Sequence, residues 1–490
     1  MTDVVIRNLQ KSPSWIVLVI GVLVSLIPVF LPGYSAAWVL FWMLAVLSLP
    51  WTLTRSFTMR LTVFFCLLAS ADFAKRLVFL LDDQAGFSQY VIYLFPYLYY
   101  FIVLLLPWGL SHLRHGLPRY QIWVWALIIV MLFNTWLSGS TSIIAKAAAT
   151  ALLILPWTII LIAAEHPESI ISVGRALVVI GILNALYAAF HRVFGPSAIE
   201  LRWMQSTSEF SIGASHLEAF VSQRYGGVNV WRPIGLQADS FTLALFCLNV
   251  YAMAWMLRVQ RRMSARIFYF VSVFLLGGIM LSLVRTVWVA ALAMIAFFFL
   301  ARRFAFLARP PIVMVLMLAM FFVADIASSM LYSFMWLAGV IKMPILARVL
   351  TTGTLEARAG SINAFVESLP RFLFHGYGLA ASSWITSKFG GFADLPLNFG
   401  KHNVVIEYLW YVGAPGLILL FAIPFFALQS VWKACSESGK VHSDLPALAA
   451  AYVIAMYLTG LGNGGAFLAP NFFYLMGILF SAKYHSRSAA

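Results

Sequence analysis

Charged residues are scarce in this chain. Only 10% of its 490 residues are Asp, Glu, Lys or Arg, whereas 62% are hydrophobic and 16% are aromatic. A soluble domain carries about 25% charged residues, so the composition excludes an ordinary soluble protein. The alternation that marks the strands of a membrane β-barrel is missing as well. Apolar runs of about 20 residues recur instead, and they predict an all-α polytopic membrane protein.

Cysteines and cofactor motifs are also few. The three cysteines, Cys66, Cys247 and Cys435, are far apart in the sequence, so they predict neither a disulfide framework nor a metal site. The chain has no phosphate-binding loop followed by lysine, no paired zinc ligands and no dinucleotide fingerprint. These absences argue against an ATP-driven machine, and we expect no metal or other cofactor.

The net charge is +15, from 32 Lys and Arg against 17 Asp and Glu, which could indicate a nucleic-acid partner. The basic residues lie in short loops between apolar runs, however, so the positive-inside rule explains them and we expect no nucleic acid. They fall on one side of a membrane if both termini are cytoplasmic. The residues that set this orientation are Arg55, Arg60, Arg114, Arg119, Arg258, Arg261, Arg262, Arg266, Arg302, Arg303, Arg309, Lys433, Lys440, Lys483 and Arg487.

The apolar windows predict about 12–14 transmembrane helices. They lie at roughly 14–32, 36–54, 58–81, 89–110, 121–138, 143–164, 169–194, 238–257, 267–284, 286–301, 311–333, 402–428, 446–462 and 470–483. Two long polar stretches interrupt them on the side opposite to the basic loops. The chain then divides into N-terminal helices (1–194), a first outer loop (195–237), central helices (238–333), a second outer loop with an amphipathic helix near 355–369 (334–401), and C-terminal helices (402–490).

Three arginines fall on the outer side against the positive-inside rule. Arg232 lies in Trp231-Arg232-Pro233-Ile234-Gly235 just before a span, where proline and glycine fix the direction of the chain. Arg285 lies in a tight turn between two spans, and Arg358 begins the expected amphipathic helix. A cation near the bilayer is costly unless an anion offsets it. Snorkelling, or pairing with Asp239 or Glu356, could explain each one singly; for all three together, a phosphate-bearing substrate explains them better.

His402 and Asn403 open a span on the same outer side, and Glu407 follows one turn later. Histidine can accept a proton near neutral pH without a metal, so it is a candidate base. A histidine at a helix start is more often an interfacial residue than a catalyst, but the neighbouring arginines favour the catalytic interpretation. Asp72, Lys75 and Arg76 lie at the end of an apolar window, where an ion pair inside the membrane is the default and a transport path is the alternative.

The order of these motifs resembles the superfamily of O-antigen ligases and Wzy-type polymerases. The resemblance covers roughly residues 225–420: Trp-Arg-Pro-x-Gly at 231–235, Ser-x-x-Arg-Thr at 282–286, the outer-loop Arg358, then Gly-x-Gly at 376–378 and His-Asn at 402–403. It implies a metal-independent glycosyltransferase with a fold similar to that of the C-type transferases. The enzyme would act on the periplasmic face of the bacterial inner membrane. Val284 stands where relatives often have a small polar residue.

The resemblance also implies a role for each residue. His402 would activate the hydroxyl of the acceptor sugar, while Arg232 and Arg285 would hold the diphosphate of an undecaprenyl diphosphate-linked glycan. Arg358 would be a third contact to phosphate or glycan, with Asn403 and Glu407 in the substrate-binding region. Guanidinium groups suit a diphosphate because they remain charged and bind it in a bidentate fork. Membrane lipids, a flippase and a chain-length regulator would be partners.

Several functions remain open. A polymerase would add repeat units of O-antigen or exopolysaccharide to a growing chain, whereas a ligase would transfer the finished glycan to lipid A-core. We favour the polymerase because the chain is long and has two large outer loops. A transporter or flippase of a lipid-linked glycan would instead place charged or broken helices at the membrane midplane.

Overall fold

A computed structural model describes a large part of the chain. The described residues are 52, 55–81, 95–112, 122–138, 142–198, 200–201, 203, 222–225, 228–324, 361–382, 385, 403–437, 444–462 and 464–481. The apolar windows predicted at 14–32 and, apart from Thr52, at 36–54 lie outside these residues, as do Arg358 and His402.

The described part is mostly helical and confirms an α-helical membrane protein. Seven helical segments in it are long and apolar enough to cross a membrane: Phe57–Ala74, Ile143–Glu165, Pro167–Phe194, Ser240–Val259, Arg285–Arg303, Val404–Glu437 and Asp444–Gly462. Five shorter apolar helices occur at Phe95–Ser111, Ile122–Leu137, Ala265–Leu281, Pro310–Ala324 and Pro470–Phe480. The expected windows therefore correspond to helices wherever the structure describes them.

The long helices agree closely with the predicted windows, except that α21 continues to Glu437, past its predicted end at 428. They are α4 (Phe57–Leu81), α10 (Ile170–Phe194), α13 (Ser240–Val259), α14 (Ala265–Leu281), α15 (Arg285–Arg303), α21 (Val404–Glu437) and α22 (Asp444–Gly462). Shorter segments are η2 (Tyr100–Leu105), α6 (Leu106–His112), α7 (Ile122–Leu137), α8 (Ile143–Ala149), η4 (Thr150–Ile154), η5 (Leu155–Trp157), α9 (Thr158–Glu165), η6 (Pro167–Ser169), β1 (Ser222–Tyr225), β2 (Val228–Trp231), η7 (Ala305–Ala308), α19 (Ser361–Phe372), η8 (Leu379–Ala381), η9 (Gly464–Leu468) and α23 (Pro470–Phe480). The amphipathic helix α19 continues past its predicted end at 369 and contains Pro370.

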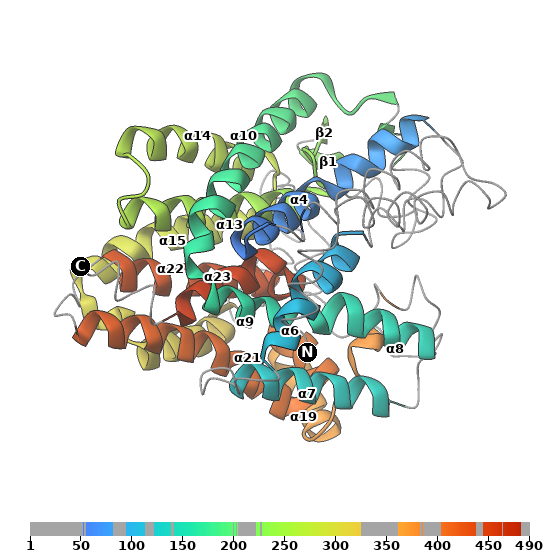
Figure 1. Cartoon of the computed structure of the whole chain (residues 1–490), viewed down its shortest axis with the longest axis vertical. Coiled ribbons are helices and arrows are strands. Elements are labelled where there is room, and N and C mark those ends of the chain that lie inside the picture. Colours follow the sequence, from blue (N-terminus) through green and yellow to red (C-terminus); the bar gives the residue numbers. More distant parts are fainter. Residues whose placement is uncertain are drawn as a thin grey trace, which may run out of the picture.

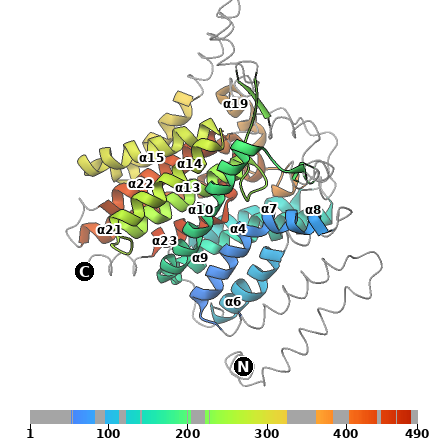
Figure 2. The same ribbon diagram turned by 90° about the horizontal axis from the view of Figure 1, so that it is seen from above.

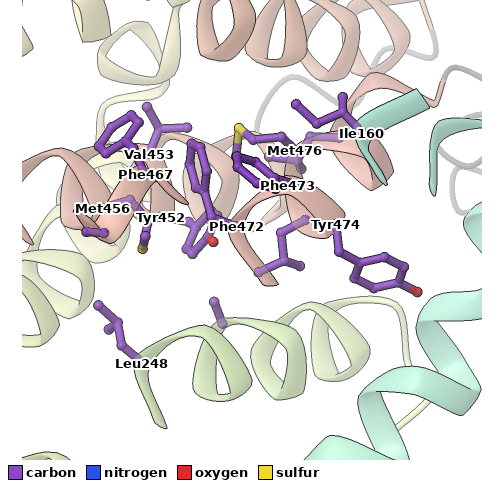
Figure 3. Packing of buried hydrophobic residues seen from close by; sticks show 14 of the residues in the cluster. Ile160, Leu248, Tyr452, Val453, Met456, Phe467, Phe472, Phe473, Tyr474 and Met476 are labelled. Carbon is purple, nitrogen blue, oxygen red and sulfur yellow. The ribbon is translucent and has the colours of Figure 1, made fainter. Parts of the chain in front are cut away.

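The centre of the bundle is formed by α13, α22 and α23. Figure 1 shows α10, α13 and α14 on one side of α22 and α23, with α7, α19 and α21 on the other side. In the membrane-spanning windows of α13 and α22, 89% and 94% of the residues are buried, against 28% in α4 and 33% in α15. Large side chains such as Tyr452, Phe472 and Phe473 fill the interior (Figure 3). Apolar side chains exposed on outer helices, such as Val273 and Leu292, are suited to contact lipid.

Side-chain contacts fix the direction of each helix. Gly174 at the start of α10 packs on Leu257 at the end of α13. Thr62 on α4 bonds Ser172 on α10 at 3.0 Å, so these two helices run parallel. Arg302 at the end of α15 pairs with Asp444 at the start of α22 at 3.0 Å. Trp255 near the end of α13 contacts Phe298 near the end of α15, with ring centroids 4.4 Å apart. Thus α4, α10 and α22 run in one direction, and α13 and α15 run in the other.

These directions give the bundle two distinct ends, named here after the first and last residues of α15. The Arg303 end carries the described members of the basic set that predicts the orientation: Arg55, Arg60, Arg258, Arg261, Arg262, Arg266, Arg302, Arg303, Arg309 and Lys433. The Arg285 end contains Arg232, Arg285 and Asn403 at the starts of α13, α15 and α21. This separation is the one that the loop charges predict. In Figure 2, the green strands β1 and β2 lie at the upper edge of the described part of the chain.

The helix α21 is broken within its apolar run. Gly413 has φ 68° and ψ −178°, which are not helical angles. Two residues later, Pro415 has no N–H to donate to the carbonyl of Tyr411. The segment 375–379 fills this gap, because Tyr377 N–H donates to Trp410 O at 2.8 Å and Gly378 N–H donates to Tyr411 O at 2.9 Å. The break therefore costs α21 few hydrogen bonds.

Side chains of α7 form further hydrogen bonds at the same break in α21. Asn134 Nδ2 donates to the carbonyl of Val412 at 2.9 Å, and Leu379 N–H donates to Thr135 Oγ1 at 3.1 Å. Gly378 has φ +80°, and a Cβ atom there would lie 2.6 Å from Cα of Thr135. Irregular backbone at membrane depth is tolerated only where protein or water satisfies its polar groups. Here α7 and the segment 375–379 supply the partners.

We expect Gly378→Ala to destabilise the fold. The new Cβ would meet the backbone of α7, and alanine is disfavoured at positive φ, for a combined cost of about 2–5 kcal/mol. The apparent melting temperature in detergent measures this cost. The matched control is Gly277→Ala on α14, where a Cβ would meet nothing within 4 Å. Equal melting temperatures for Gly378→Ala and the native protein would contradict the close packing of this loop.

Candidate functional site

Arg232 lies between a hairpin and a helix. The strands β1 and β2 pair antiparallel, with Ser222 opposite Trp231, and Arg232 follows directly. The chain then turns through 232–239 into α13, where Asp239 caps the helix by accepting Thr242 N–H at 2.8 Å. Burial raises the pKa of Asp239, and its bonds with Thr242 oppose that rise. Asp239, one of the two carboxylates considered above as partners for the three arginines, therefore has a structural role as a helix cap.

The segment 232–239, which we call the Arg232 loop, is held by buried side chains of α4. Arg76 is 3% exposed, and its guanidinium donates to Gly235 O at 2.7 Å and to Gln237 O. Gln237 Nε2 in turn donates to Ala69 O at 3.2 Å. The loop is thus bonded through its backbone to the interior of the bundle.

Glu200 supplies the counter-charge for Arg76. Its carboxylate lies 3.1 Å from Arg76 Nη1 and 2.9 Å from His191 Nε2, and it accepts the Tyr187 hydroxyl at 3.0 Å. Burial by itself would raise the pKa of Glu200. The hydrogen bonds of His191 and of Ser197 N–H, with the charges of His191 and Arg76, outweigh burial and lower this pKa to about 2. Glu200 therefore remains an anion at any physiological pH.

Arg285 is the first residue of α15 and is exposed. The turn before it is tight: Leu283 has φ 59°, and Ser282 Oγ accepts Val284 N–H at 3.2 Å. Val284 occupies the N-cap position, where its side chain offers no hydrogen-bond acceptor. The expectation of a short hairpin that presents a guanidinium at the end of the bundle is therefore correct.

The last turn of α22 packs against the start of α15, beside Arg285, and against the start of α21. A Cβ at Gly462 would lie 2.3 Å from Thr286 Cγ2, the residue after Arg285. A Cβ at Gly460 would lie 3.2 Å from Cβ of Val404, the residue after Asn403. Glycine at both positions lets α15 and α21 pack against the same turn. Arg285 and Asn403, 118 positions apart in the chain, consequently flank one element.

Asn403 and Glu407 make local contacts at the start of α21. Asn403 is buried, and its Oδ1 accepts Val405 N–H at 3.0 Å, so it is the N-cap of the helix. Glu407 bonds the hydroxyl of Tyr411 one turn further on. These contacts give both residues a structural role besides the predicted substrate contact. His402 precedes Asn403 by one peptide bond but lies outside the described residues, as does Arg358.

The partners of Arg76 were not predicted from the sequence. An ion pair was expected at Asp72, Lys75 and Arg76, but the carboxylate that pairs with Arg76 is Glu200, 124 positions away, while Asp72 accepts Ala238 N–H at 3.0 Å. The available signal was chemical: an arginine inside an apolar window requires a carboxylate, and Glu200 follows soon after the end of a window.

Among the described residues, no group of three His, Cys, Asp or Glu side chains is placed to hold a metal ion.

Comparison of the chain with family models, with curated proteins and with solved structures finds no match in any of the three.

We expect Glu200→Gln to destabilise the protein by about 3 kcal/mol at pH 7, because it leaves Arg76 buried without its counter-charge. The contribution of Glu200 is complete above the ordinary pKa of 4.5 and is lost as the pH falls through about 2. The difference in stability between native protein and variant should therefore narrow below pH 4.5. Unfolding in detergent at several pH values measures it.

The control for this variant is Glu168→Gln, which removes a carboxylate from a pair with His166 at 3.6 Å that is largely exposed. Exposed pairs contribute about 0–1 kcal/mol. A loss for Glu200→Gln as small as that of the control would contradict a buried, paired Glu200.

Proposed function

We propose that this protein is a membrane glycosyltransferase. It polymerises undecaprenyl diphosphate-linked repeat units into O-antigen or exopolysaccharide at the periplasmic face of the bacterial inner membrane. The observation that supports this most is the position of Arg232, Arg285 and Asn403 at one end of the bundle, opposite the end that carries most of the basic loop residues. Cations at this end are suited to receive an anionic lipid headgroup.

The proposed reaction needs one base and a stabilised leaving group. His402 accepts the proton of the acceptor hydroxyl, and the oxygen forms a bond to the anomeric carbon of the donor glycan. The bond from that carbon to the diphosphate oxygen breaks, and the diphosphate leaves with the electron pair. Arg232 and Arg285 bind the developing negative charge, and Arg358 contacts phosphate or glycan. Asn403 orders the start of α21 beside His402.

The finer architecture is part of the same proposal. We infer about 12–14 spans, two large periplasmic loops, a fold similar to the C-type glycosyltransferases and both termini in the cytoplasm. Two features support it: the five shorter apolar helices beside the seven long ones, and the separation of the arginines between the two ends. A glycan acceptor, membrane lipids, a flippase and a chain-length regulator would be its partners.

One observation favours the transport alternative. Broken helices are typical of transporter binding sites, and α21 is broken at Gly413. The contacts at Gly413 argue against a transport site, because groups of the segment 375–379 and of α7 already donate hydrogen bonds to the carbonyls of Trp410, Tyr411 and Val412. Those carbonyls are engaged by the protein itself. The break therefore supports an anchoring role for the second outer loop more than an ion or substrate path.

We expect Arg285→Ala to lower polymer synthesis by about 10²–10³-fold, the usual cost of losing one group that stabilises developing negative charge. Arg285→Lys should keep part of the activity, because lysine retains the charge but not the fork. The control is Arg303→Ala, an exposed arginine at the other end of the same helix. Equal synthesis by both alanine variants at equal protein level would refute the role of Arg285.

The glycans of cells lacking this protein separate the candidate functions. Core carrying a single repeat unit, or loss of secreted polymer with short lipid-linked oligosaccharide remaining, would identify a polymerase. Bare core with long lipid-linked polymer would identify a ligase. Unchanged glycans of every kind would reject both and favour transport of another substrate. Lipopolysaccharide gels and analysis of the secreted polysaccharide measure these outcomes.

A further inference from the structure

The Arg285 end contains a buried cation that the proposed reaction does not use. Arg76 makes three kinds of contact: the ion pair with Glu200 at 3.1 Å, hydrogen bonds to Gly235 O and Gln237 O, and the ring of Trp203 at 5.1 Å from its guanidinium carbon. Its acceptors come from two separate stretches of the chain, 200 and 235–237. Arg76 thus joins α4 to the segment after α10 and to the Arg232 loop.

The buried ion pair of Arg76 and Glu200 contributes little net free energy to folding. The desolvation of a buried ion pair offsets most of its Coulombic gain, so apolar residues of similar volume would often serve the fold equally well. What a guanidinium adds is geometry, since its five N–H donors have fixed directions. Glu200 keeps the cation in place, and the remaining donors fix two carbonyls of the loop.

Other polar side chains hold the same loop from both helices. Asn184 Oδ1 on α10 accepts Leu236 N–H at 2.7 Å, and Asp72 Oδ2 on α4 accepts Ala238 N–H at 3.0 Å. Gly235 has φ +57°, and a Cβ there would lie 2.1 Å from Asn184 Oδ1. Backbone groups of 235–238 are therefore bonded in succession to α4 and α10.

We propose that Arg76 is a positioning residue for Arg232. By fixing the backbone at 235 and 237, it sets the place and direction from which Arg232 reaches the diphosphate of the lipid-linked donor. The loop is also closed on its helix side, where the hydroxyl of Ser240 donates to Arg232 O at 3.4 Å. Arg76 itself is buried and does not touch substrate. The inference rests on the proposed function for the role of Arg232, but not for the clamping of the loop.

The first test is hydrogen–deuterium exchange of peptides covering 232–240 in detergent. In Arg76→Lys, an ammonium can pair with Glu200 but lacks the fork that also reaches both carbonyls. We expect the amides of this loop to exchange at least about tenfold faster, because exchange follows the free energy of local opening. Peptides of α22 should be unchanged. Unaltered exchange in the loop would overturn the proposal.

The control for this test is Arg60→Lys on the same helix. Arg60 also donates to two backbone carbonyls, Arg55 O at 3.1 Å and Val103 O at 3.5 Å, but near the Arg303 end. The Arg60→Lys substitution should leave hydrogen–deuterium exchange at 232–240 unchanged. Equal acceleration by both variants would show a general loosening of α4 and would overturn a specific role for Arg76.

The second test is a double-mutant cycle between Arg76→Lys and Arg232→Lys. The rate of polymer formation is measured on folded protein, with the lipid-linked oligosaccharide that accumulates in deletion cells as substrate. We expect Arg76→Lys to reduce the rate at least about tenfold in the native background and less than about twofold when Arg232 is already Lys, because coupled residues are not additive. Equal factors in both backgrounds would refute positioning through Arg232.

The two readouts separate the proposals. Faster exchange in the loop with no effect of Arg232→Lys on glycan synthesis would reject the proposed role of Arg232, while the clamp by Arg76 would hold. If exchange at 232–240 in Arg76→Lys is as slow as in the native protein, and Arg232→Lys strongly lowers glycan synthesis, the proposed function is retained and the clamp by Arg76 is rejected.

Discussion

Polar groups inside an apolar bundle must find their partners within the protein, and the Arg285 end is arranged by this constraint. The break at Gly413 and Pro415 would expose carbonyls of α21 at membrane depth. The amides of Tyr377 and Gly378 and the side chain of Asn134 bind those carbonyls. The segment 375–379 is thereby attached to the same helix whose start is capped by Asn403.

The same constraint explains the Arg76 network. A guanidinium that is 3% exposed must meet acceptors, and it meets a carboxylate and two backbone carbonyls. The acceptors all belong to the connection between α10 and α13, so one cation holds the start and the end of that connection together. The Arg232 loop and the segment 375–379 are therefore both anchored by hydrogen bonds of their backbone groups, and Arg232, one of the arginines proposed to bind phosphate, stands on the first of them.

Much of the fold could be predicted from hydrophobic periodicity. The limits of α4, α10, α13, α14, α15 and α22 differ from the predicted windows by three residues or fewer. Periodicity could not predict the break in α21, because the effect of Gly413 depends on a loop segment that packs against it. For the site, charge on the unexpected side indicated Arg232 and Arg285. Glu200 was missed because its partner is distant in sequence and only the packing of α4 beside α10 brings the two together.

The distances along the chain that Arg76 bridges have a consequence for biogenesis. Its partners Glu200, Gly235 and Gln237 follow it by 124, 159 and 161 residues. While the nascent chain enters the membrane, α4 must hold a cation whose ion-pair partner Glu200 has not yet been synthesised. That charge favours a position of α4 at the membrane surface or in contact with water until α10 arrives. Final docking of α4 and insertion of α10 are then linked steps, and the Arg232 loop is ordered only after both.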